Sequence, residues 1–251
     1  MSLWVIALAP LIGMFLAMFG AGGGMLTVPL LVYGVGMPLK SAIAASLWIV
    51  VVVSLTALLR QQVWKQVQPK LLAYFMVGGV LGSWLGAHLG LAIPDTVQGV
   101  MFAVLVWFVA WWMYRQGGSE ASLRNQSQPC RCALTLAVGV VLGVVTGVLG
   151  VGGGFLMVPA LIWLGVSDFK VAVSHSLILI VINAMVAGMT YLGRVELAWQ
   201  PMLWITGLAA IGCLAGSMIL NRFTTARLQT MFSLLLLLVG GIMLYDAIGT
   251  Y

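Results

Sequence analysis

Two glycine clusters 130 residues apart form the part of this sequence best suited to holding a ligand. Residues 20–29 read Gly-Ala-Gly-Gly-Gly-Met-Leu-Thr-Val-Pro, and residues 150–159 read Gly-Val-Gly-Gly-Gly-Phe-Leu-Met-Val-Pro. Each glycine costs roughly 1 kcal/mol relative to alanine inside a helix, so we expect the backbone to open at each cluster. A fresh helix would begin near Met25 and near Phe155. Its unpaired N–H groups and positive dipole end favour an anion.

An anion site in a low-dielectric interior needs more than two helix ends. Moving an anion out of water costs on the order of several kcal/mol, whereas one helix dipole offsets about 0.3–1 kcal/mol. Hydrogen bonds to the charged ligand, at about 1.5–3 kcal/mol each, must supply the difference. Hydroxyl, imidazole and amide groups near the clusters are the available donors. They are Ser46 and Ser176, which match across the 130-residue offset, and Thr27, Ser41, Ser174, His175 and Asn183.

The composition places these clusters in a membrane protein. Hydrophobic residues make up 63% of the 251 residues and charged residues only 6%, against roughly 25% charged residues in a soluble domain. Several apolar stretches are about 20 residues long, which is enough to cross a hydrocarbon core. The net charge of +6 lies in short connections, where it indicates positive loops facing the cytoplasm rather than nucleic-acid binding. No His/Cys spacing predicts a metal site, and we expect no cofactor.

The chain is a duplicated unit, because the same offset also aligns Lys40 with Lys170 and Gly82 with Gly212. The predicted fold class is all-α, a polytopic membrane protein with five helical segments in each half. The expected segments are 3–19, 25–37, 41–59, 70–92 and 97–115 in the first half, and 133–149, 155–166, 171–191, 200–220 and 228–246 in the second. Residues 1–116 form the first transmembrane repeat, residues 117–131 a cytoplasmic linker, and residues 132–251 the second repeat. The second segment of each half is short, and it either spans the membrane or re-enters it.

Loop charges predict that the two repeats have opposite orientations. The connection after the third segment is basic in the first half and neutral in the second, and the connection after the fourth segment reverses this pattern. After the third segment, the first half carries Arg60, Lys65 and Lys70, and the second half carries Arg194 and Glu196. After the fourth segment, the first half carries Asp95, and the second half carries Arg222 and Arg227. Because basic connections face the cytoplasm, we predict inverted repeats whose broken helices meet near the midplane. In a membrane, this arrangement is typical of a solute transporter.

The predicted substrate site combines both glycine clusters, the first residue of each fresh helix and three of the polar side chains. The set is Gly22, Gly23, Gly24, Met25, Ser46, Gly152, Gly153, Gly154, Phe155, His175 and Ser176. Lys40 and Lys170 begin the third segments, where each lysine either extends to the membrane interface or attracts anions. The alternative for the clusters is that their glycines only allow close helix packing.

Two further patterns restrict the function. Glycines recur at every fourth position along segment 70–92, which we interpret as a packing surface, with a sliding surface between moving bundles as the alternative. The acidic residues lie at or near segment ends, which argues against a cation site and against a carboxylate proton relay. The spans also contain no metal-protease motif and no pair of a nucleophile with a base, so we do not expect an enzyme. The glycines are Gly78, Gly82, Gly86 and Gly90, and the acids are Asp95, Glu120, Asp168, Glu196 and Asp246.

The motifs together resemble the TauE/SafE family of sulfite and organosulfonate exporters, also called the toluene sulfonate uptake permease family. The resemblance is carried by the doubled Gly-x-Gly-Gly-Gly-x-x-x-Val-Pro phrase, by Ala-x-x-x-Ser-Leu at 42–47 and 172–177, and by Leu-Gly-Arg-Val at 192–195. The first half departs from the pattern at 60–62, where Arg-Gln-Gln replaces the glycine-containing turn. The resemblance implies transport of small sulfur-containing anions across a bacterial cytoplasmic membrane. Its members are assigned to several such compounds, so it leaves the substrate open.

The sequence therefore leads to one hypothesis with two alternatives. We expect a multi-pass inner-membrane secondary transporter that exports a small sulfur oxyanion, sulfite or an organosulfonate, by rocking one half against the other. A passive anion channel with the same pore is one alternative, and an uptake permease for thiosulfate or a related compound is the other. The expected partners are the oxyanion and membrane lipid, without nucleic acid. A homo-oligomer is compatible with the sequence.

Overall fold

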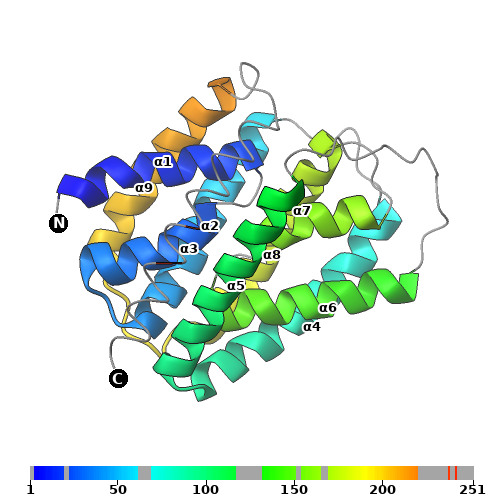
Figure 1. The fold of residues 1–251 in the computed structure, drawn as a ribbon, viewed down its shortest axis with the longest axis horizontal. Coiled ribbons are helices and arrows are strands. Elements are labelled where there is room, and N and C mark those ends of the chain that lie inside the picture. Colours follow the sequence, from blue (N-terminus) through cyan, green and yellow to red (C-terminus); the bar gives the residue numbers. More distant parts are fainter. Residues whose placement is uncertain are drawn as a thin grey trace.

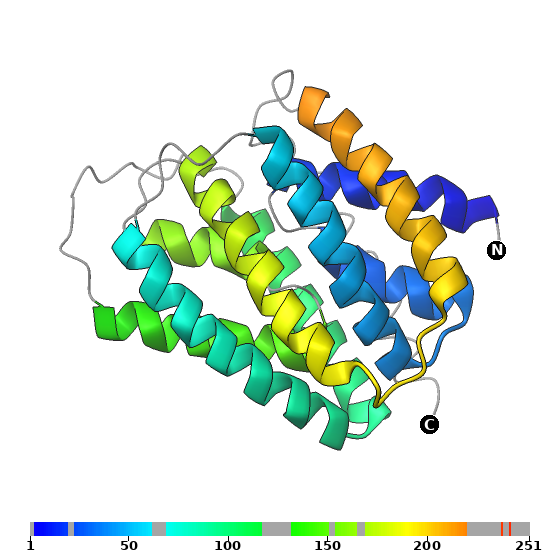
Figure 2. The same ribbon diagram turned by 180° about the vertical axis from the view of Figure 1, so that it is seen from behind.

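The computed structural model describes residues 3–19, 23–61, 69–116, 132–150, 154–164 and 169–219, together with Leu237 and Gly241 (Figures 1 and 2). These residues form helices joined by short connections, so the predicted all-α class is confirmed. The first half contains α1 (Leu3–Phe19), α2 (Gly23–Pro29), the π-helix η1 (Leu30–Gly34), α3 (Leu39–Gln61), α4 (Pro69–Ala92) and α5 (Asp95–Gln116). The second half contains α6 (Cys132–Leu149), α7 (Gly154–Trp163), α8 (Phe169–Tyr191) and α9 (Trp199–Ile219).

The helix bounds agree with the expected segments to within a few residues. The expected segment 228–246 lies outside the described residues, except for Leu237 and Gly241, which are both helical. Within the residues that the structure describes, four helices are long and apolar enough to cross a membrane: α3, α4, α6 and α8. Large apolar side chains point outward, with 66% of Leu59 and 64% of Trp204 exposed, whereas Ser46 and Asn183 are fully buried. This distribution fits a surface that faces lipid and an interior that holds polar groups.

The short second helix of the first half folds back along α1. The end of η1 returns to the start of α1, because a Cβ at Gly34 would lie 2.7 Å from a methyl group of Val5. With seven residues in α2 and five in η1, this arm rises about 18 Å. The ten residues of α7 rise about 15 Å. Both lengths fall short of the roughly 30 Å hydrocarbon core.

Glycines bring α4 and α6 into the close backbone contact that the glycine stripe predicts. A Cβ at Gly78 would lie 3.0 Å from the amide nitrogen of Val140, and one at Gly90 would lie 3.1 Å from the carbonyl oxygen of Val148. The residue numbers rise together along both helices, so α4 and α6 are parallel. From the α6 side, the same close approach is made at Gly139, Gly143 and Gly147.

The helix pair matched to α6 and α4 across the 130-residue offset, α1 and α9, makes an equivalent contact. A Cβ at Gly216 would lie 2.8 Å from the Cα atom of Met14, and Gly13 and Gly212 also face the partner backbone. The first helix of each half therefore packs against the fourth helix of the other half. The two halves are interlocked rather than placed side by side as separate bodies.

Matched helices of the two halves run in opposite directions. α3 starts five residues after η1 has returned to the start of α1, so α1 and α3 leave the same side. α4 ends on that side, because the Lys40 ammonium donates to the Leu91 carbonyl oxygen at 3.3 Å. Since α6 is parallel to α4, it runs toward the side that α1 leaves. Figure 2 shows the same relation for α3 and α8, which cross the molecule in opposite directions and pack together.

Candidate anion site at the second glycine break

The helix breaks fall at the glycine clusters, as the sequence predicts. α6 ends at Leu149 and α7 begins at Gly154, while α1 ends at Phe19 and α2 begins at Gly23. Five of the predicted site residues lie in the first turns of the new helices: Gly23, Gly24 and Met25 in α2, and Gly154 and Phe155 in α7. Gly22, Gly152 and Gly153 lie outside the described residues. The first N–H groups of α2 and α7 have no partner within their own helix.

Gly150 shows why the second break needs glycine. Its φ angle is +67°, in the left-handed region where a side chain is unfavourable. Its N–H donates to the Thr146 carbonyl oxygen at 2.9 Å, which closes the end of α6. A Cβ at Gly150 would also lie 2.5 Å from a methyl carbon of Ile43 on α3. The turn therefore depends both on backbone freedom and on direct contact with a helix of the other half.

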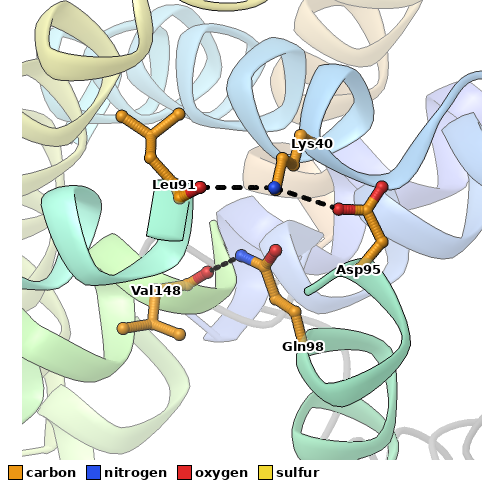
Figure 3. A network of polar contacts seen from close by, with 5 residues as sticks. All are labelled: Lys40, Leu91, Asp95, Gln98 and Val148. Atoms are coloured by element: carbon orange, nitrogen blue, oxygen red, sulfur yellow. Dashed lines mark hydrogen bonds and ion pairs between the residues drawn. The ribbon is translucent and has the colours of Figure 1, made fainter. Parts of the chain in front are cut away.

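Three side chains from three different helices hold the carbonyl oxygens at this break. The Ser46 hydroxyl of α3 lies 2.7 Å from the Gly150 oxygen, and the Tyr191 hydroxyl of α8 donates to the Gly147 oxygen at 3.1 Å. The Gln98 amide of α5 donates to the Val148 oxygen (Figure 3). We call Ser46, Gln98 and Tyr191 the carbonyl clamp. The clamp bonds the carbonyl oxygens of the break, whereas the first turn of α7 presents N–H groups.

The Ser46 hydroxyl bonds to backbone carbonyl oxygens, whereas the sequence suggests it as a donor to the anion. Its hydroxyl also lies 2.7 Å from the Ile43 carbonyl oxygen, and one O–H proton serves one acceptor at a time. Both contacts are to acceptors, so the proton points to backbone carbonyls. The structure thus brings Ser46 to the second glycine cluster, where it fixes the break.

His175 and Ser176 are buried on α8 and bond to their own helix. The Ser176 hydroxyl donates to the Val173 oxygen at 2.7 Å, which repeats the bond from Ser46 to Ile43 at the matched position. Nδ1 of His175 lies 2.7 Å from the Val171 oxygen, and because a carbonyl only accepts, Nδ1 carries the proton in this contact. Met25 is fully buried.

Lys40 forms an ion pair at the end of the site. Its ammonium lies 3.2 Å from a carboxylate oxygen of Asp95 and also bonds to Leu91, so it joins the start of α3 to the end of α4 and the start of α5 (Figure 3). The side chains are 29% and 53% exposed, respectively, so solvent weakens the pair. Lys170 lies in the first turn of α8.

Gln98 and Tyr191 are the functional residues that sequence reasoning missed. Both are buried and both bond to α6, 50 and 44 residues away along the chain. Gln98 could have been recognised from the sequence, because it is an uncharged amide in a largely apolar helix. Inside a membrane, such an amide needs a hydrogen-bonding partner. Tyr191 gave no comparable signal. Among the described residues, no group of three or more His, Cys, Asp or Glu side chains forms a metal site.

Comparison with known proteins places the whole chain among membrane transporters. Residues 5–243 match the family described as "Sulfite exporter TauE/SafE". A "Probable membrane transporter protein" of Xylella fastidiosa (strain 9a5c) is 30% identical over 236 residues, which cover 92% of this chain and 90% of the relative. The "Probable membrane transporter protein YunE" of Bacillus subtilis (strain 168) is 24% identical over 254 residues, covering 92% and 93%. No solved structure matches the chain.

Proposed function

Because the chain belongs to the sulfite exporter TauE/SafE family of membrane transporters, we propose that it is a secondary transporter for a small sulfur-containing oxyanion. The proposed substrate is sulfite or an organosulfonate. The proposed direction is export across the bacterial cytoplasmic membrane. The substrate would bind at the glycine breaks, between the first turns of α2 and α7 and the helices of the opposite half.

The carbonyl clamp is the observation that carries this proposal. Transporters that bind cations at a broken helix use the freed carbonyl oxygens as ligands. Here the oxygens of Gly147, Val148 and Gly150 already accept hydrogen bonds from protein side chains. The first N–H groups of α7 have no partner within their own helix, and such groups favour negative charge. The clamp therefore supports an anion over a cation as the solute.

The opposite directions of α1 and α6 support inverted repeats. The segment from α1 through α2 to η1 begins and ends on the same side, because η1 returns to the start of α1. This segment therefore crosses the membrane either twice or not at all. We propose that α5 crosses the membrane together with the long apolar helices α3 and α4. The number of crossings in the first half would then be odd, and an odd number inverts the second half. Exchange between two such halves is the usual basis of alternating access.

Transport by purified protein in vesicles tests the proposal. We expect labelled sulfite to accumulate against its gradient when a pH difference or a membrane potential is imposed. Gly153→Leu should abolish this flux while the protein still inserts, because the side chain would fill the break. Gly207→Leu is the matched control, since Gly207 has open space beside it.

Three results would change the proposal. Flux of sulfite only down its gradient would favour the passive channel. Accumulation of thiosulfate in preference to sulfite would favour the uptake permease. Unchanged sulfite flux in the Gly153→Leu variant would remove the glycine break from the mechanism.

A further inference from the structure

We propose that Asn183 and Ser83 form a specificity contact that recognises an uncharged hydrogen-bonding group, such as a hydroxyl, on the transported anion. This contact is separate from the glycine break and from the carbonyl clamp. The inference rests on the proposed function, because it assigns a second point of recognition to the same solute. The glycine breaks would hold the negative charge of the solute, and this contact would hold an uncharged substituent of the same solute.

Asn183 and Ser83 lie deep inside the protein, on the two helices α8 and α4, which pack together. Asn183 lies on α8 and Ser83 on α4, and each residue is more than two turns from either end of its helix. Both are fully buried. The Asn183 amide packs directly on α4, since a Cβ at Gly79 would lie 2.6 Å from both its nitrogen and its oxygen. Gly79 precedes Ser83 by one helical turn on α4, so these groups share one contact region.

The polar atoms of this region have no hydrogen-bond partner among the residues that the structure describes. Nδ2 and Oδ1 of Asn183 and Oγ of Ser83 are all buried without a hydrogen bond. Buried amides and hydroxyls are almost always bonded, and each exception calls for an explanation. A solute that supplies the missing partners gives these residues a reason to be there.

The chemistry of the amide defines the missing partner. Nδ2 donates and Oδ1 accepts, while the serine hydroxyl can do either. A sulfonate or sulfite head group without a proton has only acceptor oxygens, so it would leave Oδ1 unpaired. A hydroxyl both donates and accepts, and it therefore satisfies both sides of the amide. The contact thus fits a hydroxyl-bearing sulfonate, or an oxyanion that carries its own O–H proton.

The two positions that match Asn183 and Ser83 across the 130-residue offset lack this polar pair. Val53 of α3 corresponds to Asn183, and Cys213 of α9 corresponds to Ser83. At that crossing, the Cys213 sulfur lies 3.6 Å from the Val53 carbonyl oxygen, to which it donates. The duplicated backbone therefore does not require an amide here. The orphaned groups of Asn183 and Ser83 lie where α4 meets α8, whereas at the Cys213–Val53 crossing the orphaned group among the described residues is the neighbouring Ser54 hydroxyl. The Cys213–Val53 contact serves as the internal control for the amide.

Calorimetric binding of two sulfonates to purified protein in detergent tests the inference. 2-Hydroxyethanesulfonate and ethanesulfonate carry the same charge and differ by one hydroxyl group. We expect wild-type protein to bind the hydroxylated compound about tenfold more tightly, since a site built to bond a hydroxyl discriminates against the analogue that lacks it. In Asn183→Leu, the ratio of the two affinities should fall to about one. Cys213→Ala should keep the wild-type ratio.

Ser83→Ala keeps the test decisive if Asn183→Leu does not fold. This small change removes only the hydroxyl, and we expect it to reduce the affinity ratio severalfold. Equal binding of both sulfonates by wild-type protein would overturn the inference, as would an unchanged ratio in either folded variant. Sulfite transport in vesicles is measured separately. Absence of sulfite flux together with intact discrimination would sink the proposed function and leave the specificity contact standing.

Discussion

The two glycine breaks share a sequence phrase but differ in the side chains available to hold them. At the second break, Gln98 and Tyr191 bond the last carbonyl oxygens of α6. The residues at the matched positions for the first break are Leu228 and Gln61, and leucine has no group that could donate. Duplication therefore preserved the helices and the breaks, while the polar groups around them diverged.

The ion pair at the end of the site shows the same divergence. Lys40 faces Asp95 at 3.2 Å, whereas the residue matched to Asp95 is Thr225, which carries no charge. The two lysines align in sequence, yet the sequence has an acidic residue at the position of Asp95 and none at the position that matches it. The attraction of anions that the sequence suggests for both lysines is therefore better proposed for Lys170 than for Lys40.

The largest effect that would sharpen this comparison is expected from Gly150→Leu. The change places a side chain at a φ of +67° and against Ile43. Strain and overlap together should cost roughly 2–6 kcal/mol of stability and eliminate sulfite flux. Chemical unfolding in detergent and vesicle flux measure the two effects. Adding Ile43→Ala should recover part of the stability, and a single variant with wild-type stability would show that the break does not depend on this contact.

Gln98→Leu installs the residue that the other half carries at the matched position. It leaves the buried Val148 oxygen without its donor, so we expect a loss of about 1–3 kcal/mol in stability. We also expect reduced sulfite affinity, because the break is no longer held in place. Thermal unfolding and binding calorimetry check both expectations. Val97→Leu is the control, since that neighbouring side chain is exposed. Identical behaviour of the two variants would contradict the role of the clamp.

The smallest effects should come from the lysines. Lys40→Met removes a partly exposed ion pair, which is worth about 0–1 kcal/mol, and should leave the KM for sulfite nearly unchanged. Lys170→Met should raise the KM severalfold at low salt, and less at high salt because ions screen the attraction. Initial rates of vesicle uptake at two salt concentrations measure this difference. A larger KM effect from Lys40 would reverse the assignment.

The helices and breaks could be predicted because they depend on local chemistry. Long apolar runs specify α3, α4, α6 and α8, and a run of three glycines disfavours a continuous helix because each glycine is costly in a helix interior. The glycine stripe also predicted close packing, although its partner α6 was not evident from spacing. Each of these features depends on residues that are neighbours along the chain.

The polar contacts could not be predicted because their partners are far apart in sequence. Ser46 bonds a carbonyl oxygen 104 residues away, so its placement on the break required knowing that α3 packs against the other half. Gln98 and Tyr191 depend on the same interlocked packing. Asn183 was recognised as a donor, but its orphaned position against Gly79 follows only from how α4 and α8 cross.

The most direct test of the anion site is to locate a bound anion by diffraction. Selenite is a heavier analogue of sulfite, and its selenium can be identified by anomalous scattering in crystals of the purified protein. Our account predicts a peak within hydrogen-bonding distance of the first N–H groups of α7, beside the carbonyl clamp. A peak found only at the basic connections, with both glycine breaks closed by protein, would contradict it.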